Sequence, residues 1–113
     1  MIRLAAGLGF LGVALGAFGA HGLRERLSPS MLEVYRTGVL YHLVHAVVLL
    51  AVALGADRLV RPRAVATLFT AGIALFSGSL YALAVTGARA LGMVAPVGGL
   101  LLLAGWATLF FNR

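Results

Sequence analysis

Four long runs of apolar residues, separated by short polar segments, make up most of this chain. They extend over about residues 4–20, 38–56, 64–86 and 93–111, and none of them contains Asp, Glu, Lys or Arg. Each is close to the roughly 20 residues with which an α-helix crosses about 30 Å of hydrocarbon. Because the connections are short, consecutive helices should run antiparallel. The pattern predicts an all-α integral membrane protein, a single membrane domain over 1–113 folded as an up-and-down bundle of four transmembrane helices.

The longest connection, residues 24–36, carries a helix signal of its own. Ser30 and Glu33 have the spacing of a capping box, and Pro29 stands just before them. We therefore expect a short interfacial helix in the first loop, or an extension of the second span that begins near Ser30 and bends near Thr37-Gly38.

Small residues form a stripe along one face of the first span. They recur at intervals of four, three, four and three residues, at Ala5, Gly9, Gly12, Gly16 and Gly19. In lipid, helices associate by close packing, so such a stripe marks the approach of a second helix. Its regularity also favours a retained span over a cleaved signal peptide. Gly78 in the third span is a further expected contact. Gly98 and Gly99, just after Pro96, predict close packing against the first helix or a local kink.

Composition agrees with a membrane protein and narrows the range of partners. Hydrophobic residues make up 62% of the 113 residues, well above the roughly 45–50% of soluble domains. The net charge of +6 comes from nine arginines in the termini and loops, where they favour anionic lipid headgroups. They flank the spans rather than form one stripe with interleaved aromatics, so no nucleic-acid partner is expected. The chain has no cysteine, which excludes disulfides and thiolate metal sites.

An even number of spans places both termini on the same side of the membrane. Five arginines lie on that side, namely Arg3, Arg58, Arg61, Arg63 and Arg113. Four lie on the other side, namely Arg24, Arg26, Arg36 and Arg89. By the positive-inside rule, this margin of one predicts cytoplasmic termini.

The polar residues of the spans gather at alternating ends, and those ends meet on one side of an up-and-down bundle. The side chains expected to converge there form a candidate polar cluster of His21, His42, His45, Ser77, Ser79 and Tyr81. His42 and His45 lie three residues apart, which predicts a common face of the second span. Ionisable groups at membrane depth are rare, so the cluster is a candidate ligand pocket or a hydrogen-bonded lock between helices.

Several interpretations of the histidines are open. Neutral imidazoles can hydrogen-bond across the bundle and hold it together. They can also bind a ligand, carry protons, or coordinate a metal or haem iron. No span contains a carboxylate that would orient a ligating imidazole, so no metal or cofactor is expected.

Ser77-Gly78-Ser79, with histidines in the neighbouring span, holds the ingredients of nucleophilic catalysis. Serine beside a small residue is also typical of a packed membrane helix. Ala71, Ala74 and Gly78 already mark a small face of the third span. We therefore expect no catalytic residue here.

Four motifs, in order along the chain, resemble those of one family. They are Gly16-Ala17-Phe18-Gly19-Ala20-His21-Gly22-Leu23, Thr37-Gly38-Val39-Leu40-Tyr41-His42 with His45, Phe76-Ser77-Gly78-Ser79-Leu80-Tyr81, and Pro96-Val97-Gly98-Gly99 with Gly105-Trp106. Over essentially its whole length the chain is similar to the small four-span membrane proteins catalogued as domain of unknown function 423, whose eukaryotic relatives include transmembrane protein 256. Tyr35 departs from the family pattern, which has tryptophan there. The resemblance implies a four-helix fold and a bacterial inner-membrane location, and brings no established activity or catalytic residue.

The sequence as a whole predicts a multi-pass membrane protein that is not an enzyme. Packing features dominate it, which favours a scaffold or accessory subunit that acts through a partner protein or lipid. The alternative is an oligomeric transporter or channel for a small solute, with His42 and His45 lining its path. Proton-coupled export normally uses a carboxylate inside the membrane, so here it would depend on histidine. The expected partners are the lipid bilayer, a membrane protein or further copies of the chain.

Overall fold

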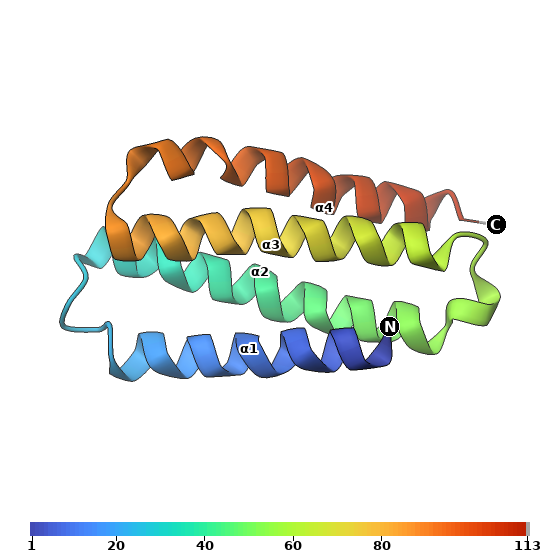
Figure 1. Ribbon diagram of the computed structural model, residues 1–113, viewed down its shortest axis with the longest axis horizontal. Coiled ribbons are helices and arrows are strands. Elements are labelled where there is room, and N and C mark those ends of the chain that lie inside the picture. The colour runs from blue at the N-terminus through green and yellow to red at the C-terminus, as the bar shows by residue number, and fades with distance from the viewer. Residues whose placement is uncertain (113) are drawn as a thin grey trace.

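Four long α-helices make up most of the computed structural model, which describes residues 1–112 (Figure 1). They are α1 (Ile2–His21), α2 (Pro29–Leu54), α3 (Pro62–Thr86) and α4 (Ala95–Phe110), with short 3-10 helices η1 (Ala56–Arg58) and η2 (Arg89–Met93) in the connections. Four helical segments, the last of them η2 together with α4, are long and apolar enough to cross a membrane. No strand occurs among residues 1–112. The prediction of an all-α, four-span membrane protein is confirmed.

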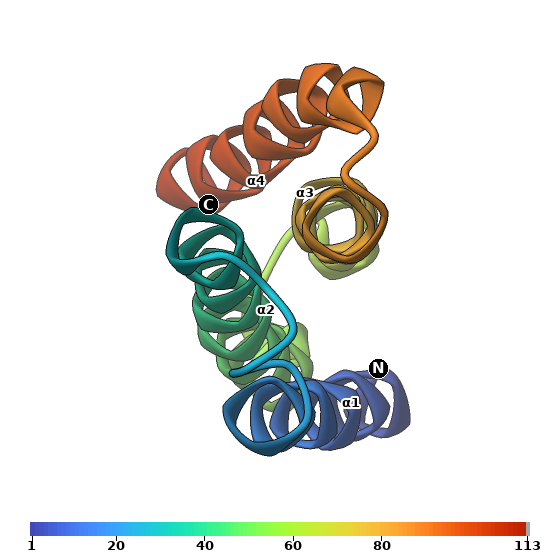
Figure 2. The same cartoon turned by 90° about the vertical axis from the view of Figure 1, so that its left-hand side faces the viewer.

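The helices pack in chain order, each antiparallel to the one before it. α1 lies against α2, α2 against α3 and α3 against α4. Viewed end-on, α2 and α3 form the centre, and α1 and α4 lie on opposite sides of them (Figure 2). The molecule is accordingly flat, with extents of 47 × 26 × 15 Å. This arrangement leaves one lateral groove between α1 and α3 and another between α2 and α4.

The first loop contains no separate helix, so the predicted short interfacial helix is not confirmed; the alternative, an extension of the second span that begins near Ser30, is what the structure shows, without the expected bend. The loop covers only residues 22–28, and α2 runs without interruption from Pro29 to Leu54. The buried Leu23 side chain packs with Leu32, Tyr35 and Ala84. This contact folds the loop back onto α2 and α3, so the chain after it leads directly into α2.

Ser28 is the N-cap of α2. Its Oγ accepts a hydrogen bond from Met31 N at 3.2 Å, whereas Ser30 already lies in the first helical turn. We expect Ser28→Ala to lower the free energy of unfolding by about 1 kcal/mol, because it leaves an N–H group of the first turn without its acceptor. Ser30→Ala is the matched control and should have a much smaller effect. Thermal unfolding of both variants in detergent tests this, and equal losses would contradict the cap assignment.

Proline and glycine delimit the last two helices. Pro62 stands in the first turn of α3 and Pro96 in that of α4, where a missing N–H leaves no helical bond unmade. Gly87 ends α3 with a left-handed backbone, at φ +70°, a conformation that favours glycine. Short connections then return the chain alongside the helix it has just left.

Glycines allow close approach between neighbouring helices. On α1, Gly12, Gly16 and Gly19 each face a side chain of α2. The closest approach of all is at Gly98, where an added Cβ would lie 2.2 Å from Phe76 N of α3. The Pro96-Val97-Gly98-Gly99 segment therefore packs against α3, not against α1 as expected.

Two of the expected contact glycines lack such a role. A Cβ added at Gly9 or at Gly78 would meet nothing within 4 Å, because no neighbouring side chain occupies the space beside them. Gly99 is only loosely packed, with the Phe76 ring 3.8 Å from its added Cβ. Three close contacts lay outside the predicted set: Gly38 against Tyr81, Gly72 against Leu102, and Gly105 against Phe69.

Candidate functional site

His42 joins three helices near the centre of the molecule. Its Nε2 lies 2.7 Å from Leu8 O of α1, and its Nδ1 lies 2.8 Å from the Tyr81 hydroxyl of α3. A carbonyl oxygen only accepts, so Nε2 carries a proton and donates it to Leu8 O. In the neutral ring, Nδ1 then accepts from the Tyr81 hydroxyl. The side chain is buried, and both of its nitrogens are engaged.

A second set of contacts ties the same three helices together beside His42. The buried Ser77 hydroxyl of α3 donates to Gly38 O of α2 at 2.7 Å. The Tyr81 ring packs on Tyr35, with their centroids 5.2 Å apart. The Tyr35 hydroxyl in turn donates to Leu15 O of α1. Each of α1 and α3 is thus bound to α2 by two side-chain hydrogen bonds, and α3 also by the contact between the Tyr81 and Tyr35 rings.

His45 faces a different neighbour, α4. Its Nδ1 donates to Tyr41 O, one turn earlier on α2, at 2.8 Å, and its Nε2 accepts from Trp106 Nε1 at 3.1 Å. An indole N–H is only a donor, so Nε2 holds a lone pair and the ring is neutral. The Phe69 and Trp106 rings flank it, with centroids 5.5 and 6.0 Å away. His42 and His45 therefore hold their protons on opposite ring nitrogens.

The six predicted cluster residues do not form one site. His42, Ser77 and Tyr81 lie together between α1, α2 and α3, while His45 lies between α2 and α4. Positions three apart on a helix point about 60° apart. On α2 this rotation is enough to direct the two imidazoles to different neighbouring helices.

The remaining two predicted residues form no hydrogen bond with the histidines of α2. Ser79 is buried, but its hydroxyl donates within its own helix, to Phe76 O at 2.8 Å. His21 is exposed at the end of α1. Tyr35 and Trp106, which the sequence did not place in the cluster, are bonding partners in this interior.

The chemistry available to this interior is limited by its own hydrogen bonds. All four ring nitrogens of His42 and His45 are already bonded, so either ring would lose a bond on binding a metal ion or a further proton. Residues 1–112 contain no group of three His, Cys, Asp or Glu placed to hold a metal ion. Ser77 is bonded to a carbonyl oxygen rather than to an imidazole, so it forms no nucleophile–base pair. The arrangement is suited to joining helices.

Several hollows lie at the surface, and three of them bear on binding. The groove between α2 and α4, of about 510 Å³, is lined by Tyr41, His45, Phe76, Pro96, Gly99, Leu100, Leu102, Leu103 and Trp106. The groove between α1 and α3 measures about 450 Å³ and is lined mainly by small residues of α3. A pocket of about 470 Å³ lies where α3 begins and α4 ends. All three are open at the surface, whereas the histidines themselves are buried.

The fold and these contacts define a four-span membrane protein in which His42, His45 and Ser77 are hydrogen-bonded across the helices. The chain belongs to the family described as "Protein of unknown function (DUF423)", which matches residues 15–99. The resemblance expected from the four motifs is thereby confirmed. The family description names no activity.

Relatives from distant organisms support this assignment. The UPF0382 membrane protein YwdK of Bacillus subtilis is 48% identical over 99 residues, which cover 85% of this chain and 80% of the relative. The UPF0382 membrane protein of Haemophilus influenzae is 43% identical, over 98% of this chain and 90% of its own length. One from Schizosaccharomyces pombe is 38% identical, over 95% of each chain. No solved structure matches the chain significantly.

Proposed function

We propose that this protein is an accessory subunit or scaffold of the bacterial inner membrane, which acts by docking laterally onto a membrane-protein partner. The observation that carries the proposal is the bonded interior: both ring nitrogens of His42 and of His45 are hydrogen-bonded, and three of these four bonds tie α2 to α1, α3 and α4. A polar group that is satisfied inside the bundle contributes to its stability and offers nothing to a passing solute. The surfaces left for interaction are therefore the outer ones.

Among these surfaces, the groove between α2 and α4 suits a protein partner best. Its wall combines the Tyr41, Phe76 and Trp106 rings with small gaps at Gly99, and Leu103 is 65% exposed at its edge. Aromatic side chains beside small residues give the shape complementarity that helix association in lipid requires. Because α1 packs on the far side of α2, it leaves this groove open. A partner helix would fill the groove.

The rival function, an oligomeric transporter that uses His42 and His45, makes a different demand. It requires an imidazole with a free nitrogen facing a path. His45 does line the groove between α2 and α4, but it is only 5% exposed and its Nε2 is held by Trp106. The structure therefore favours docking over transport, and the experiment below distinguishes the two functions.

Site-specific photo-crosslinking in cells tests the docking groove. A photoreactive residue at Leu103 should yield one protein adduct of discrete mass, because this position borders the groove. The same residue at Phe10, which is 75% exposed on α1, is the control and should yield no such adduct. Gly99→Leu, which fills the groove, should abolish the adduct at position 103. Equal adducts at positions 103 and 10 would contradict the proposal. Solute flux in proteoliposomes that contain the wild type, and its loss with His45→Phe, would instead support the transporter.

The orientation of the molecule stays a prediction of cytoplasmic termini. Among the described residues, four arginines lie at each end of the helices. The margin of one rests on Arg113, which lies outside the described residues. One acidic residue, Asp57, lies at the end that carries the termini, against Glu25 and Glu33 at the other.

A further inference from the structure

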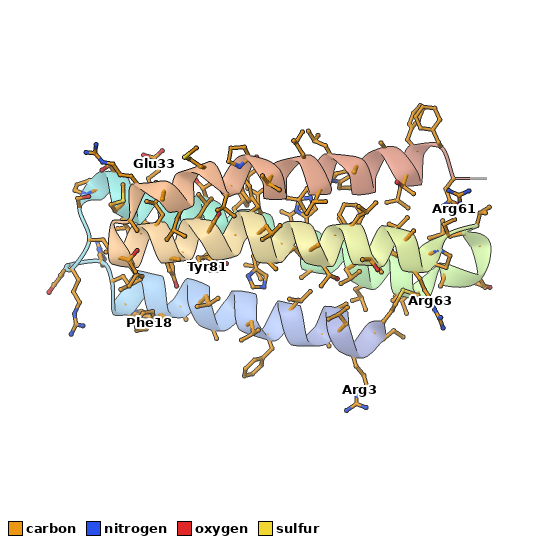
Figure 3. All side chains as sticks on the ribbon, turned by 45° about the horizontal axis from the view of Figure 1, so that its top comes forward. Arg3, Phe18, Glu33, Arg61, Arg63 and Tyr81 are labelled. Carbon is orange, nitrogen blue, oxygen red and sulfur yellow. The ribbon has the colours of Figure 1, made fainter. Side chains whose placement is uncertain are left out.

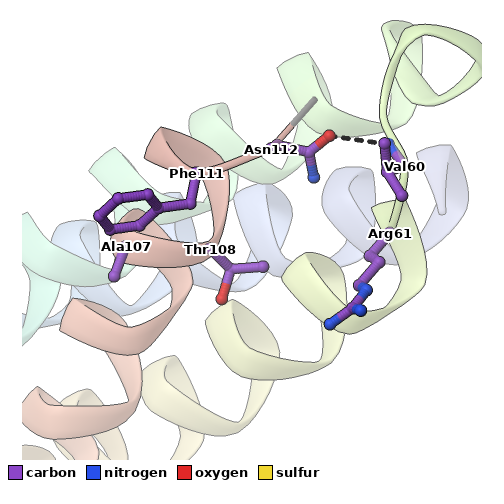
Figure 4. A pocket seen from close by; sticks show the side chains of 6 residues that line it. All are labelled: Val60, Arg61, Ala107, Thr108, Phe111 and Asn112. Carbon is purple, nitrogen blue, oxygen red and sulfur yellow. Dashed lines mark hydrogen bonds between the residues drawn. The ribbon is translucent and has the colours of Figure 1, made fainter.

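The pocket at the end of the molecule that carries both termini has features that the docking groove lacks. It lies between the start of α3 and the end of α4, and Figure 4 shows the six residues that line it: Val60, Arg61, Ala107, Thr108, Phe111 and Asn112. Its volume is about 470 Å³. Because α3 begins at Pro62 and α4 ends at Phe110, the pocket lies at the level where the hydrocarbon core meets the lipid headgroups.

The polar rim of this pocket is built by a contact between distant parts of the chain. The backbone N–H of Val60 donates to Asn112 Oδ1 at 2.7 Å, which holds the end of the chain against the connection before α3. An N–H donor requires the amide oxygen at this position, so the other amide atom is the NH₂ group. In Figure 4 this nitrogen and the Arg61 guanidinium both project from the rim of the pocket. The rim therefore offers hydrogen-bond donors.

The charge around the pocket is positive. Arg61 occupies the N-cap position of α3, and the first turn of α3 contains no acidic residue and no side-chain cap. Arg58 and Arg63 lie within three residues of it in the sequence, against one acid, Asp57, although Arg63 lines the groove between α1 and α3. The start of a helix also carries a partial positive charge from its free N–H groups. An anion is therefore the electrostatic complement of this rim.

The opposite wall of the pocket is apolar. It is formed by Ala107, Thr108 and Phe111 in the last turns of α4, and in Figure 4 the Thr108 methyl group points toward Arg61. The Thr108 hydroxyl is already used, since it donates to Ala104 O at 2.8 Å. Cationic donors above an apolar wall at the membrane interface match the two halves of a phospholipid, a phosphate and an acyl chain.

From this juxtaposition we infer that the pocket binds an anionic phospholipid, with Arg61 and the Asn112 amide on its phosphate and Ala107 and Phe111 along its acyl chain. A guanidinium binds phosphate oxygens through two parallel hydrogen bonds, which gives geometric selectivity as well as charge. This inference does not depend on the docking groove between α2 and α4, because the two surfaces share no residue.

Native mass spectrometry of the full chain, purified in detergent and mixed with phosphatidylglycerol and phosphatidylcholine of identical acyl chains, tests the inference. The wild type should retain phosphatidylglycerol preferentially. Arg61→Gln should lower that preference about tenfold, the factor expected from one lost charge-assisted hydrogen bond. Arg3→Gln is the charge-matched control. Arg3 projects away from the helices on α1 (Figure 3), and its replacement should change the preference less than twofold.

A second variant keeps the test decisive if Arg61→Gln folds poorly. Asn112→Asp retains an oxygen acceptor for Val60 N–H but replaces the NH₂ donor with a second, negatively charged oxygen, so it should also reduce phosphatidylglycerol binding. Equal losses in Arg61→Gln and Arg3→Gln would overturn the inference in favour of general surface charge. Displacement of the lipid by inorganic phosphate alone would overturn it in favour of a free-anion site. A loss of stability in Arg61→Gln without a change in lipid preference would also overturn the inference. It would mean that the positive charge of Arg61 only stabilises the partial negative charge at the end of α4.

Discussion

Gly98→Ala is expected to lower the free energy of unfolding by about 3 kcal/mol, the upper part of the range for overpacked interiors. The added Cβ would lie 2.2 Å from Phe76 N, 2.6 Å from Phe76 Cα and 2.7 Å from Leu75 C. All three are backbone atoms of α3, so no side-chain rotation relieves the overlap. The whole of α4 must move outward instead, and the dispersion contacts along that interface weaken together. Unfolding of the purified variant in mixed detergent micelles measures the loss.

Two neighbouring glycines supply matched controls for this prediction. At Gly99 the nearest atom to an added Cβ is Phe76 Cδ1, at 3.8 Å, and at Gly78 nothing lies within 4 Å. Alanine at either position should be neutral or stabilise by up to about 1 kcal/mol, since it favours the helix without meeting a neighbour. If Gly99→Ala costs as much as Gly98→Ala, the packing of α4 on α3 at Gly98 is not the cause.

The positions of the four helices follow from the sequence because lipid offers the backbone no alternative partner. An apolar run long enough to span the bilayer must be helical, whatever its local propensity. The aqueous ends are less constrained, and there the prediction failed in detail. Ser28 and Ser30 are both acceptable caps, and the choice of Ser28 depends on Leu23, which packs against α2 and α3. This tertiary contact produces no pattern in the local sequence from which the cap could be predicted.

Close helix contacts were predictable only where they repeat. The stripe on α1 recurs every three or four residues, so its face was evident, although Gly9 proved to have no neighbour. Gly38, Gly72 and Gly105 each accommodate one bulky side chain of another helix. A single glycine that faces one side chain, such as Tyr81, Leu102 or Phe69, belongs to no repeating pattern in the sequence. Its role depends on how the two helices are placed relative to each other.

The candidate site shows the same division between what is local and what is not. The sequence identified His42 and His45 as polar residues at membrane depth, since that follows from composition alone. It also placed Tyr81, the partner of His42, in the same cluster, but it did not identify Trp106 or say which carbonyls would accept, because the backbone oxygens of Leu8 and Tyr41 are groups that any residue would provide. The separation of the two rings follows from α1, α3 and α4 approaching α2 from different sides (Figure 2).

His42→Ala is the test of whether this interior is a lock between helices. We expect it to lower the free energy of unfolding by about 3 kcal/mol, because it opens a cavity where a buried ring stood and leaves the Tyr81 hydroxyl without its acceptor. His21→Ala makes the same chemical change at an exposed position and should have almost no effect. Thermal unfolding of both variants in one detergent gives the comparison.

A double-mutant cycle separates the hydrogen bond from the cavity. Tyr81→Phe alone removes the hydroxyl that His42 accepts from, whereas in the His42→Ala background the bond between these two side chains is already absent. The loss of unfolding free energy in the double variant should therefore be smaller than the sum of the two single losses by about 0.6 kcal/mol. The difference should not exceed about 1.7 kcal/mol, the largest value measured for hydrogen bonds inside membranes. Full additivity would show that His42 and Tyr81 do not interact in the folded protein. In that case the imidazole would be free for a ligand or a proton, and the transporter would become the better explanation of these histidines.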